Sequence, residues 1–241
     1  MKTTTAIITV ILFTTALSLL LYSCNTTNYY EVEESVMIDQ TENTFLAKPD
    51  KEAIKQRLAA DKDVWQGIFF SMTAITDVDF NPVYQAEISP ACEYLSNSYD
   101  RKDQAQNFFS EVDSAFQKTN SIPSGKIRSS IYLPLARELK HLSESTAKRR
   151  VLIIYSDLME YSFLADFYKK TMLEKIQTNP VEIQQMLGKA SPLVDLKGIE
   201  VIIIYQPRDN GESKQFDIVS GFYKKLLESK GAKVTIGANL I

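Results

Sequence analysis

Short apolar runs alternate with longer amphipathic segments over the last three quarters of the chain. Runs that are apolar throughout predict β-strands buried on both faces, and apolar residues at helical spacing predict amphipathic helices. The predicted strands are 67–76, 150–155, 199–205 and 233–236. The predicted helices are 102–118, 130–143, 162–176, 180–187 and 213–229.

Strands that alternate with helices of this length indicate right-handed crossovers and a mainly parallel sheet. The sequence therefore predicts an α/β fold, doubly wound, with helices on both faces of the sheet. We expect this folded domain to occupy residues 64–241. A domain of that size buries a full hydrophobic core.

The first residues have the layout of an export signal. Lys2 is the only charge before Glu31, and apolar stretches follow it at 6–13 and 16–21. A permanent transmembrane anchor is the alternative interpretation. Thr14, Thr15 and Ser18 interrupt the apolar stretch and no basic residues close it, which favours a cleaved signal.

The signal ends in Leu21-Tyr22-Ser23-Cys24, which resembles the lipobox of bacterial lipoproteins, although Tyr22 departs from the usual residue there. The resemblance implies removal of residues 1–23 and attachment of fatty acids such as palmitate to Cys24. Two or three acyl chains suffice for stable anchoring, so we expect a lipid-anchored protein of the bacterial cell envelope. Cys92 would then have no partner, and we expect it to be a small buried hydrophobe.

Residues 25–50 are polar and weakly patterned, which predicts a tether. A short helix is expected over 51–60, with Ile54 and Leu58 on one face. The acylated cysteine, the tether and this helix would together form a separate region, 24–63.

Composition excludes several function classes. The chain has 27 Lys+Arg against 30 Asp+Glu, a net charge of −3, and so lacks the cationic character of a nucleic-acid binder. A single histidine, His141, argues against a Ser-His-Asp site and excludes a multi-histidine metal site. Two cysteines cannot form a disulfide framework.

Oxygen-bearing side chains follow the predicted strands, where ligands bind in open parallel sheets. Asp77, Asp79 and Asn81 follow the first predicted strand, and Ser156-Asp157 follows the second. Carboxylate and amide oxygens suit a hard cation. The alternative interpretation is that Asp77 and Asn81 only cap a turn.

The order of elements resembles a von Willebrand factor A-type domain, whose metal-ion-dependent adhesion site joins three segments. Asp77-Val78-Asp79-Phe80-Asn81 corresponds to the first segment, Ser129 (or Ser130) to the second, and Ser156-Asp157 to the third. The resemblance implies that Mg²⁺, or else Ca²⁺ or Mn²⁺, is held by Asp77, Asp79, Asn81, Ser129 and Asp157. It also implies a partner protein that offers a carboxylate to the ion, and no enzymatic activity.

Two other functions are compatible with the sequence. Asp77-Val78-Asp79 also resembles the motif of haloacid dehalogenase-like phosphatases, although Asn81 replaces the expected Thr. That resemblance implies Asp77 as nucleophile and Asp79 as general acid. A metal-free scaffold subunit of an envelope assembly is the third possibility. Glu160 and Ser162 are expected to lie on a solvated loop and to cap the next helix.

Overall fold

The computed structural model describes residues 30–41, 45–58, 65–76, 81–93, 96–123 and 128–240. The expected signal segment, Cys24, Asp77 and Asp79 lie outside these residues.

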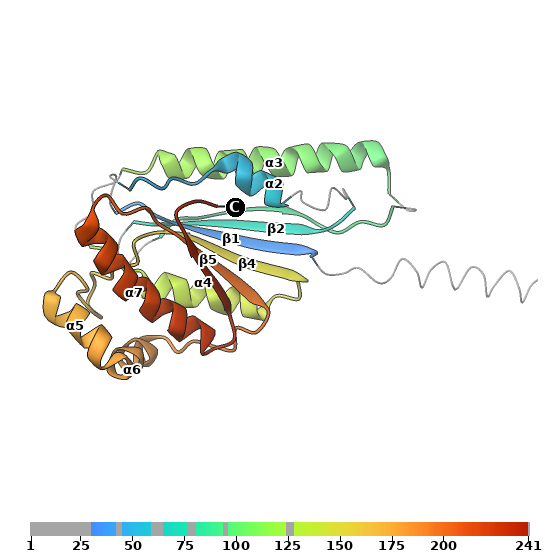
Figure 1. The fold of residues 1–241 in the computed structure, drawn as a ribbon. Helices are drawn as coiled ribbons and strands as arrows, with labels where there is room; N and C mark the ends of the chain where they lie inside the picture. The colour runs from blue at the N-terminus through green and yellow to red at the C-terminus, as the bar shows by residue number, and fades with distance from the viewer. Residues whose placement is uncertain are drawn as a thin grey trace, which may run out of the picture.

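The core of the fold is a six-stranded sheet in the order β3-β2-β1-β4-β5-β6 (Figure 1). All neighbouring strands are parallel except β3, which runs antiparallel to β2 at the edge. The strands are β1 (Val32–Asp39), β2 (Ile68–Ile75), β3 (Val83–Ile88), β4 (Arg149–Tyr155), β5 (Ile199–Ile204) and β6 (Lys233–Gly237).

Helices cover both faces of this sheet (Figure 1). They are α2 (Lys51–Leu58), α3 (Ser98–Asn120), α4 (Tyr132–Glu144), α5 (Lys170–Thr178), α6 (Pro180–Ala190) and α7 (Asn210–Glu228). Helices α2 and α3 share one hydrophobic cluster with Val36 of β1, and α4 to α7 share another with Met37, its neighbour on the opposite face. The predicted α/β class with a mainly parallel, two-sided sheet is confirmed.

The largest correction concerns β1, which lies in the segment expected to be a tether. This strand pairs with β2 on one side and β4 on the other, and all 8 of its residues are buried. Glu33, Glu34 and Ser35 interrupt its apolar residues, so it lacks the continuous hydrophobic run of a central parallel strand. The folded domain therefore begins at β1 and not at residue 64.

Buried polar partners make this composition tolerable on the face covered by α4. The hydroxyl oxygens of Ser35 and Ser71 lie 2.8 Å apart, and Thr73 donates a hydrogen bond to Glu138 of α4 at 3.1 Å. Burial raises the pKa of Glu138, an effect that the Thr73 hydrogen bond opposes. On the other face, Arg57 of α2 contacts the fully buried Glu34 at 3.3 Å.

Two further differences have local causes. Strand β3 was missed because it is an edge strand with only Ala86 and Ile88 buried. Helix α5 begins at Lys170 and not at 162, because 161–169 forms a hydrogen-bonded loop. The helix expected over 51–60 is confirmed as α2, with Ile54 and Leu58 buried.

Cys92 is disulfide-bonded and only half-buried, so the expectation of a buried cysteine without a partner is wrong. The chain has two cysteines, and the other one, Cys24, lies outside the described residues. A disulfide and a thioether-linked lipid exclude each other at the same sulfur atom. In the part of the chain that the structure describes, no helix is both long and apolar enough to cross a bilayer.

Removal of β1 tests the corrected domain boundary. A chain that starts at residue 64 lacks the strand between β2 and β4, so we expect it to show no cooperative thermal unfolding by circular dichroism. A chain that starts at residue 29 retains the whole sheet and should unfold cooperatively. Cooperative unfolding of the shorter chain would contradict a structural role for β1.

Candidate functional site

The carboxyl ends of β1 and β4 form the switch point of the sheet. The two strands are parallel neighbours, with Ile38 of β1 opposite Tyr155 of β4. The chain then leaves β1 toward α2 on one face and β4 toward α5 on the other. Adjacent connections diverge here, and open α/β sheets bind ligands beyond the strand ends at such a point.

Asp39 is the last residue of β1 and its carboxylate joins the two strand ends. One carboxylate oxygen accepts hydrogen bonds from the Thr41 backbone at 2.9 Å and the Thr41 hydroxyl at 2.6 Å. The other accepts a hydrogen bond from the Ser156 hydroxyl, which directly follows β4, at 2.9 Å. The carboxylate is buried, so these donors fix its orientation.

Asp157 follows Ser156 and is also buried. Its Oδ1 accepts a hydrogen bond from the Met159 backbone at 2.9 Å. Asp157 lines a pocket of about 210 Å³ together with Tyr205, Arg208 and other residues. Burial, followed by the charge of Asp157, raises the pKa of Tyr205. Negative charge therefore extends from the strand ends into this pocket.

The turn after Asp157 contains strained backbone. Leu158 has a φ of 62°, in the left-handed region that residues other than Gly rarely adopt, and its side chain is fully buried. The Leu158 backbone donates a hydrogen bond to the Ser156 hydroxyl at 2.9 Å. Ser156 thus connects the strained turn to Asp39.

Ser129 enters the same loop cluster from the start of α4. Its backbone forms two hydrogen bonds with Tyr161, of 3.1 Å and 2.7 Å, which tie it to the loop after β4. The residue is 4% exposed, and within the described residues its hydroxyl oxygen has no hydrogen-bond partner. Buried hydroxyls are usually hydrogen-bonded, so this oxygen is a candidate ligand atom.

Glu160 is fully buried and not on a solvated loop, which corrects the sequence-based expectation. Its Oε2 accepts hydrogen bonds from the backbones of Ile131 and Tyr132, each at 2.8 Å, and its other oxygen accepts one from Ser162. Burial raises the pKa of Glu160 in spite of these bonds.

Two of the five predicted metal ligands, Ser129 and Asp157, lie in segments that the Ser129–Tyr161 backbone hydrogen bonds join. Asn81 instead accepts a hydrogen bond from the Thr76 backbone at 2.9 Å and so bridges the ends of the loop that joins β2 to β3, as the turn-capping alternative predicts. Asp77 and Asp79 lie outside the described residues. Sequence reasoning missed Asp39 and Thr41, although the apolar run Val36–Ile38 before Asp39 is the pattern of a strand end.

The oxygens at this edge suit a hard cation, because they include two carboxylates and several hydroxyls. Among the described residues no three side chains of Asp, Glu, His or Cys form a metal-binding group. A cation at this edge would therefore need hydroxyl ligands in addition to Asp39 and Asp157. The unpartnered Ser129 oxygen fits such a role.

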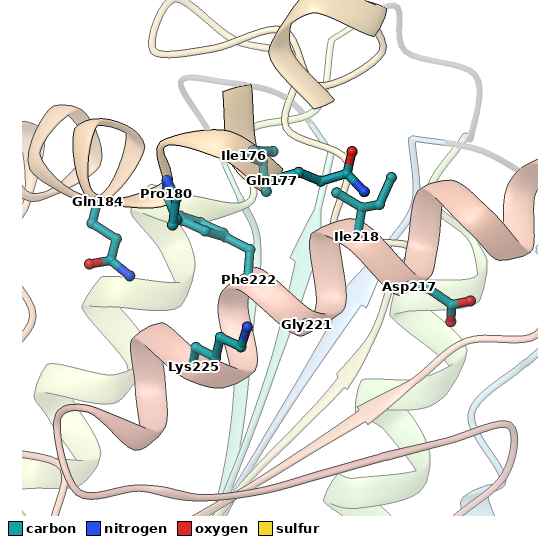
Figure 2. A pocket seen from close by; sticks show the side chains of 9 residues that line it. All are labelled: Ile176, Gln177, Pro180, Gln184, Asp217, Ile218, Gly221, Phe222 and Lys225. Carbon is teal, nitrogen blue, oxygen red and sulfur yellow. The ribbon is translucent and has the colours of Figure 1, made fainter. Parts of the chain in front are cut away.

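A second hollow, of about 440 Å³, lies between the α5–α6 hairpin and α7 (Figure 2). Its apolar lining includes Ile176, Ile218 and Phe222. Asp217 and Lys225 lie at opposite sides of the view (Figure 2). One carboxylate and one separated ammonium group do not form a ligating or catalytic set, so the strand ends remain the candidate site.

Comparison with known proteins identifies no matching family model and no matching curated protein. The solved structures that are similar include three at low identity. The PilB minor pilin from Streptococcus sanguinis has a TM-score of 0.46 at 10% identity, covering 88% of this chain and 58% of that one. The pilus adhesin SpaC from Lactobacillus rhamnosus GG scores 0.43 at 9% identity, covering 88% and 28%.

Proximal thread matrix protein 1 from the mussel byssus scores 0.36 at 9% identity, covering 89% of this chain and 43% of that one. This chain therefore spans less than two thirds of each of these proteins. At such scores the similarities carry no inference about function.

The strain at Leu158 predicts that a Gly variant is more stable than an Ala variant, the reverse of the usual order in a helix. Leu158→Ala and Leu158→Gly remove the same packing, but only Gly adopts a positive φ without penalty, so Gly should be more stable by about 1 kcal/mol. Urea unfolding measures the difference. At Leu139, fully buried inside α4, the order should reverse because Gly disfavours helix. An Ala variant more stable than Gly at 158 would contradict the strain.

Proposed function

We propose that this chain is a von Willebrand factor A-like domain that binds a partner protein through a divalent cation. The ion, Mg²⁺ in the first place, is held by Asp39, Thr41, Ser129 and Asp157 at the switch point of the sheet. This proposal keeps the predicted mechanism but replaces the first segment of the motif. Asp39-Gln40-Thr41-Glu42-Asn43 takes the place of Asp77 to Asn81.

The observation that carries the proposal is the contact between Asp39 and Ser156. This hydrogen bond of 2.9 Å places the carboxylate of the central strand beside the segment that contains Asp157. Two buried carboxylates near each other repel, and a divalent cation offsets that repulsion. Asn43 of the replaced segment lies outside the described residues, so the proposal rests on Asp39 and Thr41.

The corrected segment also resembles the family motif more closely than the first interpretation. That motif has hydroxyl residues at the third and fifth positions, and Thr41 supplies the third, where Asp79 had a carboxylate. The site then has one negative charge fewer than the predicted set. Recognition would be directional, because a carboxylate of the partner completes the coordination of the ion and no covalent bond changes.

The proposed ion site and the proposed membrane anchor lie toward opposite ends of β1. The chain enters the sheet at the amino end of β1, whereas Asp39 lies at its carboxyl end. A strand of 8 residues spans about 26 Å, at roughly 3.3 Å per residue. We therefore infer that an anchor before β1 leaves the site facing away from the membrane.

Thermal unfolding in the presence of Mg²⁺ tests the metal site. At an Mg²⁺ concentration of one hundred times Kd, the free energy of unfolding should rise by about 2.7 kcal/mol, and EDTA should reverse the rise. Asp39→Asn and Asp157→Asn should each abolish the effect, because each removes a carboxylate from the site.

The matched control is Asp113→Asn on α3, which makes the same charge change where Asp113 pairs with Lys51 and Lys55. This variant should retain the response to Mg²⁺. If the unchanged protein shows no response, or if Asp39→Asn keeps it in full, the metal proposal is wrong.

The anchoring proposal depends on the fate of the Cys24 sulfur. We expect Cys24→Ser to shift the protein from the membrane fraction to the soluble fraction, because acylation requires the thiol. Cys92→Ser removes the other cysteine and should leave the membrane association unchanged. A mature chain whose intact mass contains no acyl group, and which has a disulfide under non-reducing conditions, would contradict lipid attachment.

A further inference from the structure

Two loops that are distant in sequence are joined beneath the candidate site. The backbones of Ser129 and Tyr161 exchange two hydrogen bonds, and the Glu160 carboxylate binds the backbones of Ile131 and Tyr132. One short segment after β4 therefore holds the residues on both sides of Ser130. The same segment begins with Asp157, so the junction links two of the proposed ligands.

A carboxylate suits this junction for electrostatic reasons. Helix α4 has no side-chain cap of its own, since its N-cap residue is Ile131. The first backbone N–H groups of a helix lack partners within the helix and carry partial positive charge. One Glu160 oxygen, Oε2, accepts from two N–H groups at this end, and hydrogen bonds to a carboxylate are stronger than neutral ones.

Glu160 serves the start of α4. Its Oε2 accepts hydrogen bonds from the backbones of Ile131 and Tyr132, its other oxygen accepts one from Ser162, and the residue has no exposed surface. The hydroxyls of Ser130 and Ser162 and the phenol of Tyr223 also interact with Glu160.

We propose that Glu160 is the positioning residue of the ion site, which fixes the Ser129 hydroxyl relative to Asp157 by binding the N-terminus of α4. This inference rests on the proposed function, because it assigns a residue on which the ion affinity of that site depends. Residues that orient metal ligands without touching the metal typically change its affinity 10–100-fold when they are replaced.

The experiment measures Mg²⁺ affinity by isothermal titration calorimetry for three variants of the full chain. Glu160→Ala removes the junction and should weaken Mg²⁺ binding by about 10–100-fold. Glu160→Gln should bind Mg²⁺ nearly as well as the unchanged protein. Its amide oxygen accepts from the two N–H groups, and its NH₂ group donates to Ser162. This rescue separates positioning from a direct effect of charge.

The matched control is Glu138→Ala, which removes another buried carboxylate from α4 where it bonds to Thr73. It should lower stability but leave Mg²⁺ affinity unchanged, so a general loss of stability cannot imitate the expected result. If Glu160→Ala does not fold, Glu160→Asp replaces it, because the shorter side chain withdraws the carboxylate from α4. That variant should bind Mg²⁺ measurably more weakly.

Amide hydrogen exchange without metal provides a second readout. Protection of the Ile131 and Tyr132 amides should fall in Glu160→Ala and remain in Glu138→Ala. If the unchanged protein binds Mg²⁺ and the folded Ala or Asp variant of Glu160 binds it equally well, the positioning role is overturned while the proposed function stands. If the unchanged protein binds no Mg²⁺, the proposed function fails and this role fails with it.

Discussion

The winding of the sheet is the constraint on which the site depends. Parallel neighbours end at the same edge, so the insertion of β1 between β2 and β4 brings Asp39 next to Ser156 although 117 positions separate them. The local hydrogen bonds of these residues, from Thr41 to Asp39 and from Leu158 to Ser156, do not by themselves produce this contact. Any change that displaces β1 therefore removes the site together with the fold. A truncation that deletes β1 cannot remove the site and leave the fold intact.

This dependence explains which parts were predictable from sequence. Strands β4 and β5 are continuous apolar runs because both of their faces are buried, and hydrophobicity alone identifies them. Strand β1 is equally buried, but Glu33, Glu34 and Ser35 find their partners on other elements, such as Arg57 and Ser71. The hydrophobic pattern of β1 alone does not reveal those partners, because they are distant in sequence. This central strand was therefore not predicted.

The residues of the candidate site were likewise predictable only where the element beside them was recognisable from its sequence. Asp157 was predictable because it follows a recognisable strand, and Ser129 because it precedes an amphipathic helix. Asp39 was not predictable, because its strand was not recognised. Asp77, which follows the next strand, was therefore assigned to the position of Asp39. Glu160 was assigned to solvent because a glutamate is rarely fully buried unless it is paired. Its partners are backbone N–H groups of α4, which no sequence pattern indicates.

The strained turn at Leu158 shows how the arrangement is held in place without an ion. A left-handed leucine costs roughly 1–2 kcal/mol, and such a conformation persists only where surrounding contacts determine it. Here Ser156 accepts from the Leu158 backbone while it donates to Asp39, and the Leu158 side chain packs in the core shared by α4 and α7. The turn redirects the chain so that Glu160 and Tyr161 reach the start of α4. The orientation of these oxygens is therefore set by folding, and the ion of our proposal would meet a site that needs little rearrangement.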